Sequence, residues 1–144
     1  MTSIDDLLAD FDFLEDWEDR YRHLIDLGKD LPPLADEDRN AENKVRGCAS
    51  QVWITSTVGG SAENPILHFS GDSDALIVKG LIAIAFMLFQ DKPAADILST
   101  DVAPVLQQLG LSEHLTPQRS NGFASMIARI KADAQAAIQA SSSS

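Results

Sequence analysis

The chain contains a single cysteine, Cys48, and the residues before it are of types that favour thiol chemistry. Gly47 precedes it directly, and a glycine allows the backbone to turn sharply or to adopt a positive φ at no steric cost. Lys44 and Arg46 lie within four residues on its N-terminal side, and nearby positive charge favours the thiolate, which is the nucleophilic form. The local sequence therefore predicts a thiol carried on a turn, where functional residues are often found.

A second interpretation of Cys48 stays open from composition and spacing alone. A free cysteine is commonly a small buried apolar residue that is kept for packing rather than for reactivity. On this interpretation the chain would be a plain binding protein with an inert cysteine, and a small thiol reagent would fail to label the native protein.

Three segments of the chain, taken in order, carry a family resemblance. Residues 43–53 read N-x-V-x-G-C-x-S-x-V-W, which resembles the cysteine loop of the SufE family of sulfur acceptors. Residues 71–83, beginning GDSDA, and residues 114–122, beginning HLTP, are similar to further segments of the same family. With the N-terminal helix, the resemblance covers nearly the whole chain, although residues 59–65 and the terminal serines match nothing diagnostic.

The resemblance implies a sulfur carrier that works beside a cysteine desulfurase of the SufS or CsdA type. The Cys48 thiolate would attack the outer sulfur of the desulfurase persulfide, in a step similar to thiol–disulfide exchange. The sulfur would then pass to a downstream scaffold for iron–sulfur cluster assembly, and no cofactor is implied. We expect an apolar hollow beside the loop, because a persulfide is easily reduced or oxidised.

Five residues of the matched segments are expected to line the docking site for the partner: Gly47, Gln51, Trp53, Asp72 and Arg119. Three of them have structural alternatives. Trp53 lies in a predicted strand and could belong to the core, and Asp72 could be a helix N-cap. Arg119 could pair with Asp72 or a carbonyl group, or reach the partner.

A different class of function also remains open. The chain could be a free-standing thiol enzyme that uses Cys48 as nucleophile and His114 or His68 as base. Turnover by the isolated protein would favour this alternative over a sulfur carrier.

Composition and charge limit the other classes. The formal net charge is −11, which argues against a nucleic-acid groove or an anionic membrane surface as partner. The three histidines share no ligand spacing with the cysteine or with one another, so no metal site is predicted. The acidic beginning and the lone cysteine are typical of a cytoplasmic protein with a reduced thiol.

The element pattern predicts one α+β domain over residues 1–144. Residues 52–58 and 66–70 have the composition of an antiparallel hairpin, and the resemblance implies a third strand just before the cysteine. The sheet of about three strands would pack against several helices in a SufE/IscU-like fold.

Apolar spacing predicts the helices around this sheet. One amphipathic helix should cover residues 4–25 and stop at Gly28. A core helix should begin at an N-cap at Asp72 or Ser73 and run to about Gln90, with Gly80 packed closely against a neighbour. Further helices are expected, namely 94–98, 102–109 and a last one from Thr116-Pro117 or Ser120, with 141–144 frayed.

Overall fold

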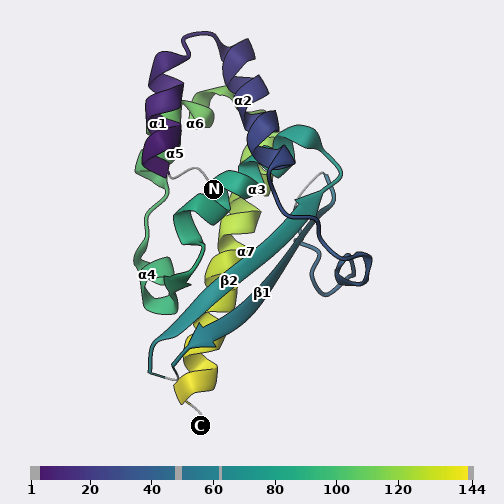
Figure 1. The fold of residues 1–144 in the computed structure, drawn as a ribbon, viewed down its shortest axis with the longest axis vertical. Helices are drawn as coiled ribbons and strands as arrows, with labels where there is room; N and C mark the ends of the chain where they lie inside the picture. The colour runs from purple at the N-terminus through teal and green to yellow at the C-terminus, as the bar shows by residue number, and fades with distance from the viewer. Residues whose placement is uncertain (1–3, 48–49, 62, 143–144) are drawn as a thin grey trace.

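The computed structural model describes residues 4–47, 50–61 and 63–142, and a long β-hairpin crosses its centre (Figure 1). Strand β1 (Val52–Gly60) pairs antiparallel with β2 (Pro65–Ser73) along its whole length. The short strand β3 (Lys92–Pro93) pairs with the other edge of β2, so the strand order is β1-β2-β3. The predicted α+β class with a three-stranded antiparallel sheet is therefore confirmed.

The third strand lies elsewhere than the sequence predicted. Before the cysteine, Lys44 makes only an isolated antiparallel bridge to Trp53. The strand that completes the sheet is β3, which directly follows the core helix. It is brought to the sheet edge by Asp91, whose backbone φ is +56° and whose amide donates to the carbonyl of Leu67 at 2.9 Å.

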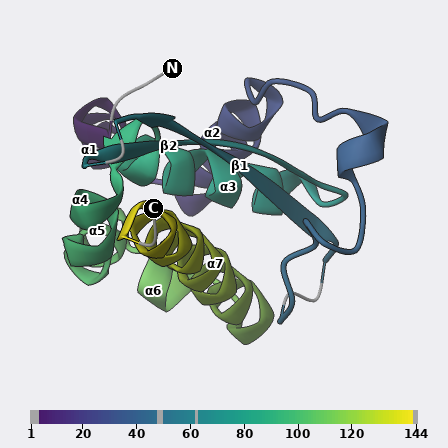
Figure 2. The same cartoon turned by 90° about the horizontal axis from the view of Figure 1, so that it is seen from below.

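Two helices cover one face of the hairpin, as Figure 2 shows. They are α3 (Leu76–Phe89), which is apolar on nearly every side, and the long α7 (Pro117–Ser142). Helix α2 (Trp17–Lys29) packs against α3. The largest buried side chains of the core include Phe11, Ile54, Leu67, Phe69, Leu81, Ile82, Phe86, Phe89 and Phe123. The expected role of α3 as a core helix is confirmed.

The backbones of α2 and α3 meet at two glycines. A Cβ atom added to Gly80 would lie 2.2 Å from the carbonyl oxygen of Leu24, and one added to Gly28 would lie 2.7 Å from the amide nitrogen of Gly80. The close packing predicted for Gly80 is therefore confirmed. Gly28 was expected to end its helix, but it lies inside α2 because the close approach to α3 requires a residue without a side chain.

The N-terminal helix is divided into two, so the prediction of one continuous helix is wrong. Helix α1 (Ile4–Phe13) ends before Asp16, whose carboxylate caps α2 by accepting from the amide of Glu18 at 3.1 Å. The Arg20 guanidinium donates to the carbonyl of Leu14 at 2.6 Å and stabilises the turn between the helices. An apolar stripe continues across the break, which is why periodicity alone did not find it.

The remaining helices agree with the predictions apart from their ends. Gly110 has φ +73° and closes one of them, as expected. The last helix continues through residue 142, so residues 141 and 142 are helical rather than frayed, and residues 143–144 lie outside the described part. The connecting elements are η1 (Asp36–Asp38), α4 (Ala94–Ser99), α5 (Ala103–Leu109) and α6 (Leu111–His114), of which η1 and α6 were not predicted.

Replacing Gly80 with alanine tests the contact between α2 and α3. Alanine is favoured over glycine in a helix by about 1 kcal/mol, yet its methyl group would meet the backbone of Leu24. We expect a net loss of about 1–3 kcal/mol in the free energy of unfolding, measured by denaturant titration. Gly59→Ala is the matched control, because a Cβ atom there would meet only the carbonyl oxygen of Ile66, at 4.0 Å. Equal stability of the two variants would contradict this account.

Candidate functional site

The segment that carries the cysteine is closed at its base by backbone pairing. The amide of Val45 donates to the carbonyl of Val52 at 2.8 Å, and the amide of Ile54 donates to the carbonyl of Asn43 at 2.9 Å. These bonds join the two ends of residues 46–51 and attach them to β1. Cys48 itself lies outside the described residues, so the site is built from its neighbours.

The exit of the loop is held by the junction between β2 and α3. The backbone amide of Gln51 donates to the Asp74 carboxylate at 3.0 Å. Its carbonyl accepts from the Ser73 hydroxyl at 2.7 Å and from the Asp74 amide at 3.3 Å. The Ser73 oxygen also accepts from the amide of Ala75 at 3.2 Å, directly before α3. The loop is therefore tied to the start of the core helix.

The entry of the loop rests on α7. Gly47 has φ +89°, and a Cβ atom there would lie 2.5 Å from the Ser125 hydroxyl oxygen. Figure 2 shows the segment that leads to this residue passing beside α7. The turn predicted at Gly47 is present, and its positive φ favours glycine at this position.

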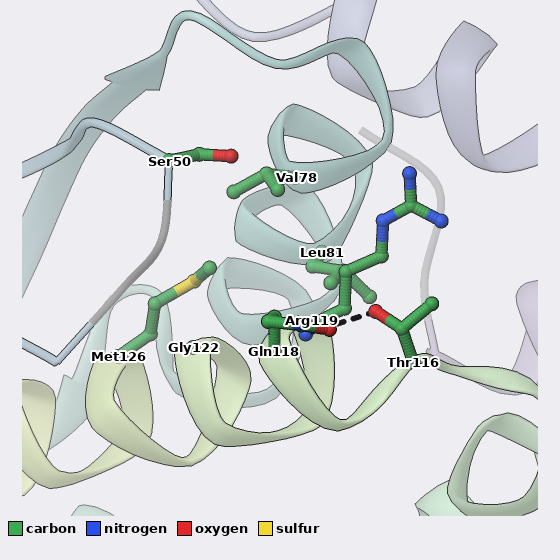
Figure 3. A pocket seen from close by; sticks show the side chains of 8 residues that line it. All are labelled: Ser50, Val78, Leu81, Thr116, Gln118, Arg119, Gly122 and Met126. Atoms are coloured by element: carbon green, nitrogen blue, oxygen red, sulfur yellow. Dashed lines mark hydrogen bonds between the residues drawn. The ribbon is translucent and has the colours of Figure 1, made fainter.

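A cavity of about 170 Å³ opens next to the loop exit (Figure 3). It lies between α3 and the first turns of α7, and its wall includes Ser50, two residues after the cysteine in the sequence. Apolar side chains form much of the remaining wall, in agreement with the expected hollow. The lining residues are Ser50, Val78, Leu81, Thr116, Gln118, Arg119, Gly122 and Met126.

Arg119 lies at this cavity, in the first turn of α7. Its backbone amide donates to the Thr116 hydroxyl at 3.3 Å, and in Figure 3 its side chain extends beside Leu81. Among the described residues, its guanidinium makes no hydrogen bond or ion pair, and Asp72 pairs with other cations. Of the alternatives left open by the sequence, a pair between Arg119 and Asp72 is therefore not formed.

Asp72 is a buried strand residue, so the interpretation of this residue as a helix N-cap is wrong. Strand β2 extends through Ser73, and Asp72 lies opposite Trp53 within the pairing. Its carboxylate accepts from the Arg39 guanidinium and lies 3.4 Å from the Lys79 ammonium nitrogen. The residue is only 8% exposed, and these two cations compensate its buried charge.

Trp53 lies outside the core, on the face of the hairpin away from α3. Its neighbours Val52 and Ile54 are fully buried, whereas Trp53 is half-buried. The Arg39 guanidinium lies 5.9 Å from the centroid of its ring, within reach of a cation–π interaction. Trp53 and Asp72 are therefore neighbours on one surface beside the cysteine loop.

The two histidines proposed as bases have other contacts. The His114 ring stacks on Trp17 at 3.9 Å between centroids, and its carbonyl accepts from the Tyr21 hydroxyl at 2.5 Å. The His68 ring lies 2.9 Å from the Asp91 carboxylate. His68 is also five positions along β2 from Ser73, or about 17 Å at the rise of a strand. His114 is held by packing and His68 lies far from the loop exit.

Sequence reasoning missed the residues that position the loop. Ser73 and Asp74 precede a helix, where such residues are usually caps, and here they hold Gln51. Asn43 lies in the matched motif, and its side-chain amide donates to the carbonyl of Asp38 at 2.9 Å, within the segment before the loop. The available signal in the sequence was the presence of short polar residues on both sides of the cysteine motif and before the core helix.

Two further findings concern the described residues. They contain no group of three His, Cys, Asp or Glu side chains that could hold a metal ion. None of the described helices combines the length and the apolar character needed to cross a membrane.

Comparison with known proteins identifies a family and two similar sequences. The family model described as SufE, Fe-S metabolism associated domain, matches residues 5–134. An uncharacterized SufE-like protein of Rhizobium etli is 53% identical over 135 residues, which cover 94% of this chain and 91% of that protein. An uncharacterized SufE-like protein of Rhizobium meliloti is 50% identical over 140 residues, covering 97% and 100%.

A solved structure shares the fold. The solution structure of a hypothetical protein from Thermus thermophilus has a TM-score of 0.73 and 19% sequence identity, and the match covers 94% of this chain and 96% of that one. This likeness shows a common architecture. The family model spans most of the chain and the two relatives are at least 50% identical to it, and so the chain belongs to the SufE family, which is associated with iron–sulfur metabolism.

Proposed function

We propose that the protein accepts persulfide sulfur from a cysteine desulfurase onto Cys48, stimulates that desulfurase and passes the sulfur on for iron–sulfur cluster assembly. The observation that carries the proposal is the arrangement around the one cysteine. Its loop is held at the base by β1, at the exit by Ser73 and Asp74, and at the entry by α7, with a cavity beside Ser50.

The transfer needs no oxidant or reductant. The Cys48 thiolate attacks the terminal sulfur of the donor persulfide, and a new sulfur–sulfur bond forms on Cys48. The sulfur–sulfur bond of the donor breaks, and the donor cysteine leaves as a thiolate. Lys44 and Arg46 support the first step, since positive charge near a thiol favours its ionised form.

The cavity beside the loop exit would shelter the bound sulfur between transfers. Val78, Leu81 and Met126 give it apolar walls, and such walls exclude the water and polar reductants that would remove a persulfide. Its volume of about 170 Å³ is enough for a cysteine side chain that carries one further sulfur atom.

The surface around the loop would dock the desulfurase and later the scaffold. The residues expected there are Gly47, Gln51, Trp53, Asp72 and Arg119. Leu76, in the first turn of α3, adds an apolar side chain that is 57% exposed. A reducing compartment such as the cytoplasm would keep the lone thiol available.

A free-standing thiol enzyme is less well supported. Such an enzyme needs a base within hydrogen-bond reach of its nucleophile. His114 stacks on Trp17, and His68 pairs with Asp91 toward the middle of the hairpin. Catalysis by the isolated protein is therefore not part of the proposal.

Cys48→Ser tests the carrier function directly. A hydroxyl is essentially un-ionised near neutral pH and cannot hold a sulfane sulfur, so mass spectrometry after mixing with desulfurase and cysteine should find no added sulfur. The desulfurase should turn over no faster with the variant than alone. Because the exchange is close to isosteric, melting temperature and complex formation should be nearly unchanged.

An inert buried cysteine would give the opposite pattern for this variant. A hydroxyl buried without a partner would destabilise the fold by about 1–3 kcal/mol, while stimulation would survive in the folded fraction. Full stimulation of the desulfurase by folded Cys48→Ser protein would end the proposal.

Arg119→Glu tests the docking surface. Its guanidinium is unpaired among the described residues, so reversing its charge should leave the melting temperature nearly unchanged. The concentration of the variant that gives half-maximal stimulation of the desulfurase should rise roughly tenfold. A change of this size is expected for a contact at the centre of an interface. Lys92→Glu is the control, since this exposed lysine lies on β3 at the far end of the sheet. Equal effects of the two variants would exclude Arg119 from the docking surface.

A further inference from the structure

A second cavity, of about 350 Å³, lies on the entry side of the cysteine loop. It is bounded by residues 41–46, which form the stem of the loop, and by Ser125 and Arg129 of α7. Gly47 lies against Ser125, which lines this second cavity. The lining residues are Ala41, Glu42, Lys44, Val45, Arg46, Ser125 and Arg129.

The wall of this second cavity is basic in a strongly acidic chain. Three of the eleven Lys and Arg residues line it, although the formal net charge is −11. Among the lining residues that the structure describes, Glu42 alone is acidic. The cavity thus carries a charge opposite in sign to that of the molecule.

The three cations are not equally compensated. In the described part of the chain, the side chains of Lys44 and Arg46 make no hydrogen bond or ion pair. Arg129 is fixed in place by the Asp133 carboxylate, with Nε 3.2 Å from Oδ1, and its Nη2 lies 3.5 Å from the carbonyl oxygen of Ile54. The cavity wall therefore combines the guanidinium of Arg129, which is held by its own contacts, with the uncompensated cations of Lys44 and Arg46.

We propose that this cavity is a binding site for a small oxyanion, a carboxylate or phosphate group, held by Lys44, Arg46 and Arg129. Guanidinium and ammonium groups donate short, charge-assisted hydrogen bonds to such oxygens. The Ser125 hydroxyl at the cavity wall supplies a further donor. The volume suits a small molecule that carries one or two such groups.

Occupation of this site acts on the neighbouring thiol. Lys44 and Arg46 precede Cys48 by four and two residues in the sequence, and cations near a thiol favour the thiolate. An anion bound between them offsets their charge, so the reactivity of the thiol falls when the site is filled. The inference goes beyond the proposed sulfur transfer and does not depend on it, since both consequences are measurable without a desulfurase.

Calorimetric titration of the whole chain with inorganic phosphate, and separately with succinate, at constant ionic strength tests the site. We expect saturable binding of at least one of the two, and the arms distinguish phosphate from carboxylate recognition. Binding to the Lys44→Gln/Arg46→Gln variant should be roughly tenfold weaker, and Glu42→Gln should bind more tightly than the native chain. Lys92→Gln should bind as the native chain does.

The named variants keep the test decisive. The substituted side chains are all exposed and unpaired among the described residues. Circular dichroism should therefore show that every variant folds as the native chain does. If the double variant does not fold, Lys44→Gln alone replaces it in the titration. No saturable heat with either anion would overturn the proposal. Equal loss of affinity in Lys92→Gln and in the double variant would also overturn it.

The rate of Cys48 alkylation by iodoacetamide supplies the second readout. Saturating anion should slow labelling at least about twofold in the native chain, because the reaction proceeds through the thiolate. The same anion should have no effect on the double variant. An equal effect of the anion on both proteins would show ionic screening alone and would overturn the coupling to the thiol.

Discussion

The hydrogen bond from the amide of Val45 to the carbonyl of Val52 is the constraint on which the site depends. It closes the cysteine loop at its base and makes the loop an extension of β1. Strand β1 is in turn paired along its whole length with β2, whose inner face packs on α3. These bonds thus attach the described residues on both sides of the cysteine to the core.

A second set of contacts joins the loop to the buried charges at the end of the hairpin. Ser73 and Asp74 hold Gln51, while the adjacent Asp72 is buried between the cations of Arg39 and Lys79. Removing one member of a buried charged group leaves an uncompensated charge, which costs more than the intact group contributes. A change at Asp72 therefore acts on stability and on the position of the loop together, and any role it has in docking is superimposed on this structural one.

The sequence predicted features that depend on local chemistry and missed those that depend on tertiary contacts. The hairpin, the apolar core helix and the turn at Gly47 follow from composition and spacing, and all are present. The break before Asp16 was missed because the apolar stripe continues across it, and β3 because two residues carry no period. Asp72 was misassigned because Asp before a helix usually caps it, whereas here the pairing with Trp53 extends the strand past it. The hollow beside Ser50 was expected from the chemistry of a persulfide and not from any pattern in the residues.

The residues around the cysteine loop carry positive charge, whereas the molecule as a whole is acidic. In the proposed transfer, a negatively charged donor persulfide would approach the Cys48 thiolate, and like charges at close range repel unless nearby cations compensate them. The chain as a whole adds to that repulsion, with a formal net charge of −11. Lys44 and Arg46 precede Cys48 closely in the sequence and carry the opposite charge, and Arg129 lies at the wall of the same cavity as these two cations. In the two proposals above, sulfur transfer and the affinity for a competing anion depend on the same cations, so a substitution that alters one is expected to alter the other.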